Sequence, residues 1–160
     1  MNCHPLCSDP PNGFNIVHNG IVTKPAALRL VLQNRKYKFE SETDTEVVAI
    51  LTKYVYDSQP NKRITFTEFV KAVFKELDGS FDFVFGSKPH YPDEVVTARR
   101  GSRLLVGVNT DKKLKVDFFD VEFAGQESDK KITDSRESVN ALKRIYSFSD
   151  TVFSLAYRDF

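Results

Sequence analysis

Apolar and polar residues follow a helical period of about 3.6 in the first half of this chain and a strand period of two in the second. The helical part predicts three amphipathic helices, at about residues 25–35, 43–55 and 67–77. The alternating part predicts strands at Phe81–Phe85, Glu94–Arg100, Leu104–Val108, Leu114–Phe123 and Phe148–Tyr157. Early helices followed by late strands indicate the α+β class.

The first helix is expected to have Thr23 as its N-cap and Pro25 in its first turn. Its buried face is expected to consist of Leu28, Val31 and Leu32. A polar loop at 125–138 and a further helix at Val139–Tyr146 are predicted near the end of the chain.

The second and third helices each carry the signature of a capping box, a Thr followed three residues later by Glu. Thr43 with Glu46 marks the start of the second helix, inside the acidic segment Ser41–Glu46. Thr65 with Glu68 marks the start of the third helix, and Gly79 is expected to stop it.

The segment Phe14–Thr23 places apolar pairs on either side of His18-Asn19-Gly20. Asn-Gly between apolar runs is typical of a β-hairpin, because both residues accept a positive φ at low cost. The same tripeptide also offers a side-chain amide and a backbone N–H, the donors of an oxyanion hole. The pattern alone favours the hairpin turn.

Composition and charge narrow the classes of function. The chain has 160 residues, which is the size of one domain, and its 41% hydrophobic and 28% charged residues argue against disorder and against a membrane protein. A net charge of +1 removes the electrostatic signature of a nucleic-acid binder. Two cysteines and no signal peptide predict a cytoplasmic protein without membrane or nucleic-acid partners.

Two groups of side chains have the residue types of a metal site or an acid–base pair. Cys3, His4 and Cys7, with His18, match no common zinc-ligand spacing, so no metal site and no cofactor are expected. Glu42 and Glu46 are four residues apart, and a solvated pair is expected there rather than an acid–base couple.

Three further positions each have two interpretations. Asp44 either binds an ammonium group or only interacts favourably with the positive end of the helix dipole. The segment Arg99-Arg100-Gly101-Ser102 either holds a phosphate or ends a strand in a tight turn. His90 and the basic residues of segment 112–115 are expected to be solvated.

Several segments at these spacings resemble one family. They are VHNGIVT, KFESETDTEVVA, FVKAVFKELDGSFDFVF, TARRGSRLLVGV and DKKLKVDFFDVEF. Together they resemble the glutaminase domain, a class II glutamine amidotransferase, of the glutamine–fructose-6-phosphate aminotransferases, in a form similar to the fungal enzymes. The resemblance covers about residues 2–123.

The resemblance implies an N-terminal-nucleophile hydrolase fold, in which stacked antiparallel β-sheets are flanked by α-helices. It implies hydrolysis of glutamine and transfer of the ammonia to fructose 6-phosphate, which gives glucosamine 6-phosphate for UDP-N-acetylglucosamine synthesis. By the same resemblance, Asn19 and the Gly20 N–H correspond to the oxyanion hole, His18 and Gly20 to glutamine-contacting positions, and Asp44 to the carboxylate that holds the ammonium group. Asn19 and Asp44 would then face one glutamine.

The chain departs from the family where the nucleophile and the carboxylate-binding arginine are expected. The Met-Cys-Gly-Ile start and the His-Thr-Arg-Trp motif do not occur, and the sequence contains no Trp. Cys3 corresponds to a serine of the family, and its amine lies in a peptide bond.

These departures set the expectations for the whole chain. It is expected to be a partial amidotransferase domain at 1–127, without the N-terminal strands and truncated at both ends, followed by a divergent tail at 128–160. We expect it to be inactive alone, with glutamine binding in doubt. The alternative is a non-catalytic module that associates with a full-length paralogue and regulates it.

Overall fold

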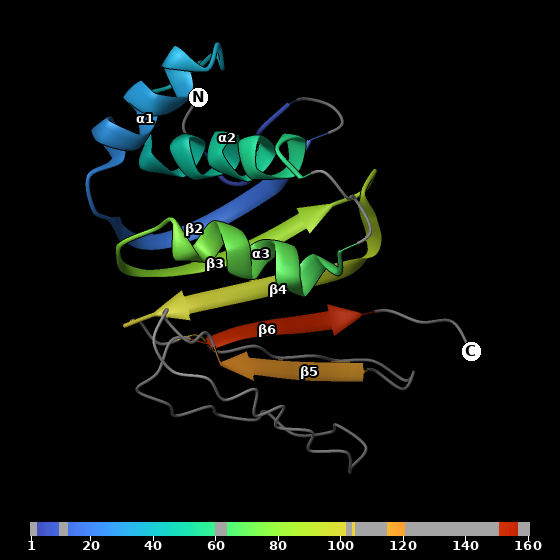
Figure 1. The fold of residues 1–160 in the computed structure, drawn as a ribbon. Coiled ribbons are helices and arrows are strands. Elements are labelled where there is room, and N and C mark those ends of the chain that lie inside the picture. The colour runs from blue at the N-terminus through green and yellow to red at the C-terminus, as the bar shows by residue number, and fades with distance from the viewer. Residues whose placement is uncertain are drawn as a thin grey trace.

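The computed structural model describes residues 3–9, 13–59, 64–101 and 104, together with the backbone of 115–120 and 151–156. These residues form three helices and six strands (Figure 1). In chain order the elements are β1 (Leu6–Cys7), β2 (Asn15–Val22), α1 (Pro25–Asn34), α2 (Asp44–Asp57), α3 (Phe66–Lys75), β3 (Gly79–Ser87), β4 (Tyr91–Arg100), β5 (Lys115–Asp120) and β6 (Thr151–Ala156).

The six strands pair in one antiparallel sheet with the order β1-β2-β3-β4-β6-β5. The helices gather on one side of this sheet, with α2 packed against β2 and α3 against β4 (Figure 1). This confirms the α+β class. The described residues contain one of the sheets that the N-terminal-nucleophile fold implies, with a helical layer on one face.

The core lies between the helices and the inner face of the sheet. Strand β3 supplies Phe81, Phe83 and Phe85, all completely buried, as the period-two pattern predicts. The other large buried side chains come from β2, α1, α2, α3 and the residues beside them: Phe14, Ile16, Leu32, Val47, Val48, Phe66, Phe69, Phe74 and Leu77.

The expected hairpin at His18-Asn19-Gly20 is wrong. Strand β2 runs straight through these residues, and His18, Asn19 and Gly20 pair with Phe83, Asp82 and Phe81 of β3. Gly20 has the positive φ that the turn signal implies, 119°, but inside a strand. A Cβ there would lie 2.4 Å from the Ser80 carbonyl oxygen, so glycine permits a close approach of two strands.

Helix ends agree with the sequence at the starts of α2 and α3 but not at the start of α1 or the end of α3. The capping box of Thr65 and Glu68 is present at α3. Thr43 is the N-cap of α2, but the predicted box with Glu46 is only half formed, because the Glu46 carboxylate accepts from Glu40 and Ser41 instead. The N-cap of α1 is Lys24, in the left-handed conformation, so the expectation for Thr23 is wrong. Gly79 does not stop α3, whose C-cap is Glu76, but opens β3.

The face of α1 differs from the expectation in one residue. Leu32 is buried and Leu28 packs against the core, whereas Val31 is half exposed. Strands β5 and β6 confirm the two late strands over shorter ranges. The expected strand at Leu104–Val108, the loop at 125–138, the helix at Val139–Tyr146 and the boundary at residue 127 lie outside the described residues.

None of the helices in the described part of the chain has the length and apolar character that a membrane crossing requires.

Candidate functional site

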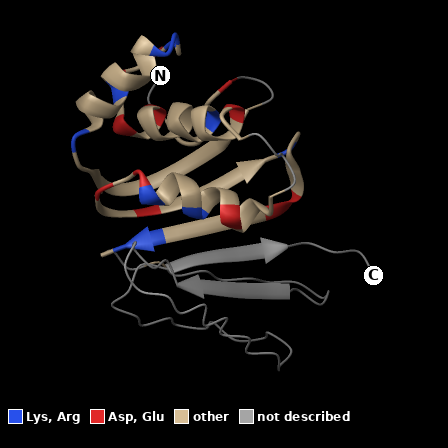
Figure 2. Ribbon diagram, in the orientation of Figure 1, with Lys and Arg blue, Asp and Glu red and all other residues tan. Residues whose placement is uncertain are grey.

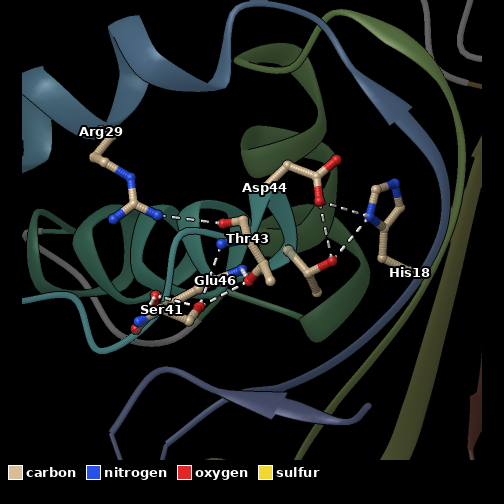
Figure 3. Close-up of polar contacts among 7 residues, drawn as sticks. His18, Arg29, Ser41, Thr43, Asp44 and Glu46 are labelled. Atoms are coloured by element: carbon tan, nitrogen blue, oxygen red, sulfur yellow. Dashed lines mark hydrogen bonds and ion pairs between the residues drawn. The ribbon is translucent and has the colours of Figure 1, made fainter. Parts of the chain in front are cut away.

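Two residues that the resemblance singles out, His18 and Asp44, meet where β2 passes the first turn of α2 (Figure 3). The Nδ1 atom of His18 lies 3.7 Å from Oδ1 of Asp44 and 3.0 Å from Oγ1 of Thr45. The imidazole stacks on the ring of Phe83, with 4.5 Å between the ring centroids. The ring is therefore fixed on one side by an aromatic face and at its edge by the start of α2.

Burial differs sharply between these two partners. The His18 side chain is 4% exposed, whereas the Asp44 side chain is 31% exposed. Burial lowers the pKa of His18, and a charge on His4 would lower it further, while Asp44 and Asp82 act in the opposite direction. The imidazole is thus neutral near pH 7, and the partly exposed carboxylate of Asp44 is the charge that the site presents to a ligand.

Local sequence fixes the start of α2. The Thr43 side chain accepts a hydrogen bond from the Glu46 N–H, at 3.2 Å, so Asp44 becomes the first residue of the helix. A carboxylate in this turn lies at the positive end of the helix dipole. Figure 2 shows the acidic residues at this end of α2 and the two arginines at the C-terminal end of β4.

Glu46 is not part of a solvated pair with Glu42, which corrects the expectation for it. Its side chain is buried, while Glu42 is exposed. The Glu46 carboxylate accepts hydrogen bonds from Glu40 N–H at 2.6 Å, Ser41 N–H at 2.8 Å and Ser41 Oγ at 2.7 Å. Glu46 therefore ties the segment before α2 to the first turn of that helix (Figure 3).

Asn19 takes a different direction from its neighbour. Successive side chains of a strand point to opposite faces, so Asn19 leaves β2 on the outer face, away from His18 and α2. It is exposed, and its register partner on β3 is Asp82, which in turn pairs with Arg99 of β4. The structure thus joins His18 with Asp44 but places Asn19 on the other face of the sheet, so the two side chains expected to face one glutamine, Asn19 and Asp44, point to opposite sides.

The edge of the sheet connects these two faces. Strand β1 pairs with β2 only at Asn15 and Ile16. Among the described strand pairings, β2 is therefore an edge strand at His18, Asn19 and Gly20.

Arg100 is the last residue of β4, which agrees with the strand-end part of the second interpretation, and its side chain contacts the end of α3. Its guanidinium donates to the carbonyl oxygens of Leu77 and Phe74. It also lies 4.5 Å from the ring centroid of Phe74 and 5.4 Å from that of Phe81. Gly101 follows in a left-handed conformation, and Ser102 lies outside the described residues.

Other candidate residues are separate from the His18–Asp44 contact. Cys3 and Cys7 are free thiols, Cys7 within β1, and the described residues contain no group of three or more metal-ligating side chains. His90 is exposed as expected, yet its ring contacts Tyr56 at 4.3 Å between centroids. Lys115 begins β5, and Lys112 and Lys113 lie outside the described residues.

Sequence reasoning missed Thr45. It is buried and lies between His18 and Asp44, with its hydroxyl 3.4 Å from Asp44 Oδ1. The only sign of it in the sequence is a Thr directly after the acidic first residue of α2, and such a Thr is common in helices. Only the packing of β2 against α2 gives this hydroxyl a partner.

Comparison with known proteins gives one family. Residues 2–106 match the family described as the glutamine amidotransferase domain. The chain is 54% identical over 123 residues to the "Probable glutamine–fructose-6-phosphate aminotransferase [isomerizing]" of Schizosaccharomyces pombe, covering 77% of this chain and 17% of that protein. It is 50% identical over 125 residues to the glutamine–fructose-6-phosphate aminotransferase of Saccharomyces cerevisiae, with the same coverage of 77% and 17%. The chain thus spans less than a fifth of the length of these relatives.

A solved structure has a similar fold. Glutamine phosphoribosylpyrophosphate amidotransferase from B. subtilis aligns with a TM-score of 0.50 and 19% identity, over 96% of this chain and 24% of that one. At this identity the likeness concerns the fold alone, and it supports the α+β N-terminal-nucleophile architecture expected from the sequence.

Proposed function

The chain belongs to the glutamine amidotransferase domain family, and from this premise we propose that its described residues form the ammonium-binding part of a glutamine site. In this proposal the Asp44 carboxylate binds the α-ammonium group of glutamine. Asn19 and the Gly20 N–H face the side-chain amide from the β2 edge. The reaction served is the one named for the relatives, amino transfer to fructose 6-phosphate, which yields glucosamine 6-phosphate.

The observation that carries this proposal is the placement of Asp44. Its carboxylate is partly exposed, contacts a buried neutral imidazole, and stands at the first turn of a helix beside an edge strand. A carboxylate in such a position offers a primary ammonium a charge-assisted hydrogen bond without removing both charges from water. In this proposal, the bound amino acid also reaches Asn19 and Gly20 along the same edge.

We further propose that the 160-residue chain does not hydrolyse glutamine by itself. The family reaction uses a cysteine whose own amine is the base, and the amine of Cys3 is acylated by Asn2. Cys7 pairs with Asn15, which is three residues from His18 along β2, or about 10 Å in an extended strand. Neither cysteine therefore has both a free α-amine and a place beside His18, which the family reaction requires.

Binding is tested by NMR titration of the ¹⁵N-labelled chain with L-glutamine. We expect small, concentration-dependent shifts at the start of α2, and no saturable heat by calorimetry at millimolar glutamine. Asp44→Asn should abolish the shifts, while Asp93→Asn, at an exposed position of β4, should leave them unchanged. Glutaramate, which lacks the α-ammonium group, should shift nothing at α2; equal shifts with glutaramate would contradict the role of Asp44.

Turnover is tested by glutamate release from the same chain. We expect no release above a heat-treated control. Steady release that Cys3→Ala abolishes would show that the chain hydrolyses glutamine and that the proposal about turnover is wrong.

A second candidate function is that of a non-catalytic module that associates with a full-length aminotransferase. Three exposed apolar side chains on the outer face of the sheet, Val17, Ile21 and Val95, favour it. Its test is co-elution of the chain with the S. cerevisiae aminotransferase on a sizing column. Co-elution that Ile21→Lys abolishes would support association, and separate elution would refute it.

A further inference from the structure

Three groups form a short polar chain at the start of α2: the His18 imidazole, the Thr45 hydroxyl and the Asp44 carboxylate (Figure 3). The first two are buried, and only the carboxylate is partly exposed. Both contacts of the carboxylate use Oδ1, at 3.4 Å from Thr45 Oγ1 and 3.7 Å from His18 Nδ1. Its other oxygen, Oδ2, takes no part in either contact.

The proton positions along this chain follow from the donor inventory. A threonine hydroxyl has one proton, so Thr45 donates either to Asp44 or to His18. If Thr45 donates its proton to the Asp44 carboxylate, its oxygen accepts the Nδ1–H of His18. The hydroxyl proton then faces a carboxylate oxygen, and the ring proton faces the hydroxyl oxygen. That arrangement puts the ring proton on Nδ1, where two oxygens face it. It leaves Nε2, which is buried and has no hydrogen-bond partner among the described residues, as an unprotonated nitrogen.

The imidazole itself has little freedom. It lies flat on Phe83, with 21° between the ring planes, and its backbone is held in the β2–β3 ladder. Thr45 is the second residue of α2, so its backbone is fixed by the helix. The Thr45 hydroxyl is therefore fixed by the imidazole. An aspartate at an exposed helix end would otherwise sample several side-chain rotamers, so a contact with this fixed hydroxyl restricts Asp44.

We propose that Thr45 is a positioning residue: its hydroxyl, oriented by His18, holds Oδ1 of Asp44 so that Oδ2 is presented to the ammonium group of an amino-acid ligand. The ligand part of this inference rests on the function proposed above. The orientation of Asp44 by Thr45 is a property of the protein without ligand and is measured separately.

The perturbation is Thr45→Val, which keeps the shape of the side chain and removes the hydroxyl. Thr45→Ser restores the hydroxyl without the methyl group and should act as the rescue variant. Thr52→Val is the matched control, because Thr52 is another fully buried threonine of α2 whose hydroxyl bonds to the Val48 carbonyl oxygen at 2.7 Å. All three variants are made in the full 160-residue chain, and their melting curves establish that they fold.

The first readout is the side-chain rotamer of Asp44, from three-bond couplings of its carboxyl carbon to the backbone. We expect one dominant rotamer in the wild type, Thr45→Ser and Thr52→Val, and averaged couplings in Thr45→Val. The ring ¹⁵N shifts of His18 should report the Nδ1–H tautomer in the wild type. A single Asp44 rotamer retained in Thr45→Val overturns the proposal, because a merely structural threonine would give that result.

The second readout is the apparent affinity for L-glutamine, taken from the initial slope of chemical shift against glutamine concentration in the same NMR titration, which does not require saturation. We expect Thr45→Val to weaken it about five-fold or more and Thr45→Ser to leave it within two-fold. If Asp44→Asn abolishes the glutamine shifts but Thr45→Val does not weaken them, the positioning inference is wrong and the proposed function stands. If Thr45→Val disorders Asp44 while Asp44→Asn leaves the glutamine shifts unchanged, the proposed function is wrong and the orienting role stands.

Discussion

Replacing Glu46 by Gln should destabilise the chain far more than the same replacement at Glu42, although the two residues share one acidic segment. Glu46 is buried, and its two oxygens accept three hydrogen bonds from the backbone N–H groups of residues 40 and 41 and from the Ser41 hydroxyl. Glu42 is exposed. The contrast separates burial and hydrogen bonding from simple charge, which both replacements remove equally.

The magnitude follows from the geometry. A hydrogen bond to a charged acceptor contributes about 1.5–3 kcal/mol. A glutamine side chain keeps one acceptor oxygen, so it turns an NH₂ group toward at least one of the donors that Glu46 now satisfies. The N–H of Glu40 belongs to an exposed residue and regains part of its loss from water. Loss of the charge at the helix start adds about 0.3–1 kcal/mol. The expected cost is about 2–3 kcal/mol for Glu46→Gln and about 0.5 kcal/mol or less for Glu42→Gln.

Urea denaturation followed by circular dichroism measures this difference. With a slope of about 2 kcal/mol per M, the midpoint for Glu46→Gln should fall by about 1 M or more, and that for Glu42→Gln by about 0.3 M or less. Equal midpoints for the two variants would refute the reasoning, since they would show that the carboxylate contacts of Glu46 add nothing to stability.

Three further predictions concern separate parts of the fold. Arg100→Met should lower stability by about 1–2 kcal/mol in urea denaturation, because the carbonyl oxygens of Phe74 and Leu77 and two aromatic faces lose their cation. An unchanged midpoint would contradict the capping role. Burial lowers the pKa of His18, so the unfolded chain binds a proton on His18 at higher pH than the folded chain does. The free energy of unfolding should therefore fall as pH drops below about 6.5, and His18→Gln should flatten this pH dependence. Burial and the Asp57 hydrogen bond raise the pKa of Tyr37 to about 12, so stability should fall as pH rises above about 10, and Tyr37→Phe should remove this loss.

The sequence correctly predicts several parts of the fold whose signals are local and meet no competing long-range contact. The capping box at Thr65 and Glu68 joins residues three apart, and the alternation of Phe81, Phe83 and Phe85 needs only one strand, so both are found correctly. At α2 the N-cap is also found, but the Glu46 carboxylate turns to Glu40 and Ser41 instead of Thr43. The path of the preceding loop decides that contact, and no spacing rule describes it.

The candidate site is harder to predict because its contacts cross long separations. His18 and Thr45 are 27 residues apart, and their contact depends on the packing of β2 against α2. The hairpin prediction failed for the same reason: the pairing of β2 with β3 competes with the local turn preference of Asn19-Gly20 and wins. A local rule cannot weigh an eight-residue ladder to a strand some sixty residues away.

Gly20 shows how a correct residue preference led to a wrong structure. The positive φ inferred from Asn-Gly is present, but the close backbone of Ser80 and Phe81 requires it, not a turn. The chain therefore continues as a strand, and alternation sends His18 to the helix side and Asn19 to the outer face. Because β1 stops pairing at Ile16, both directions remain accessible from one edge among the described strands. In the proposed site a glutamine bound across that edge would contact both Asn19 and Asp44, and the short β1 leaves β2 unpaired there among the described strands.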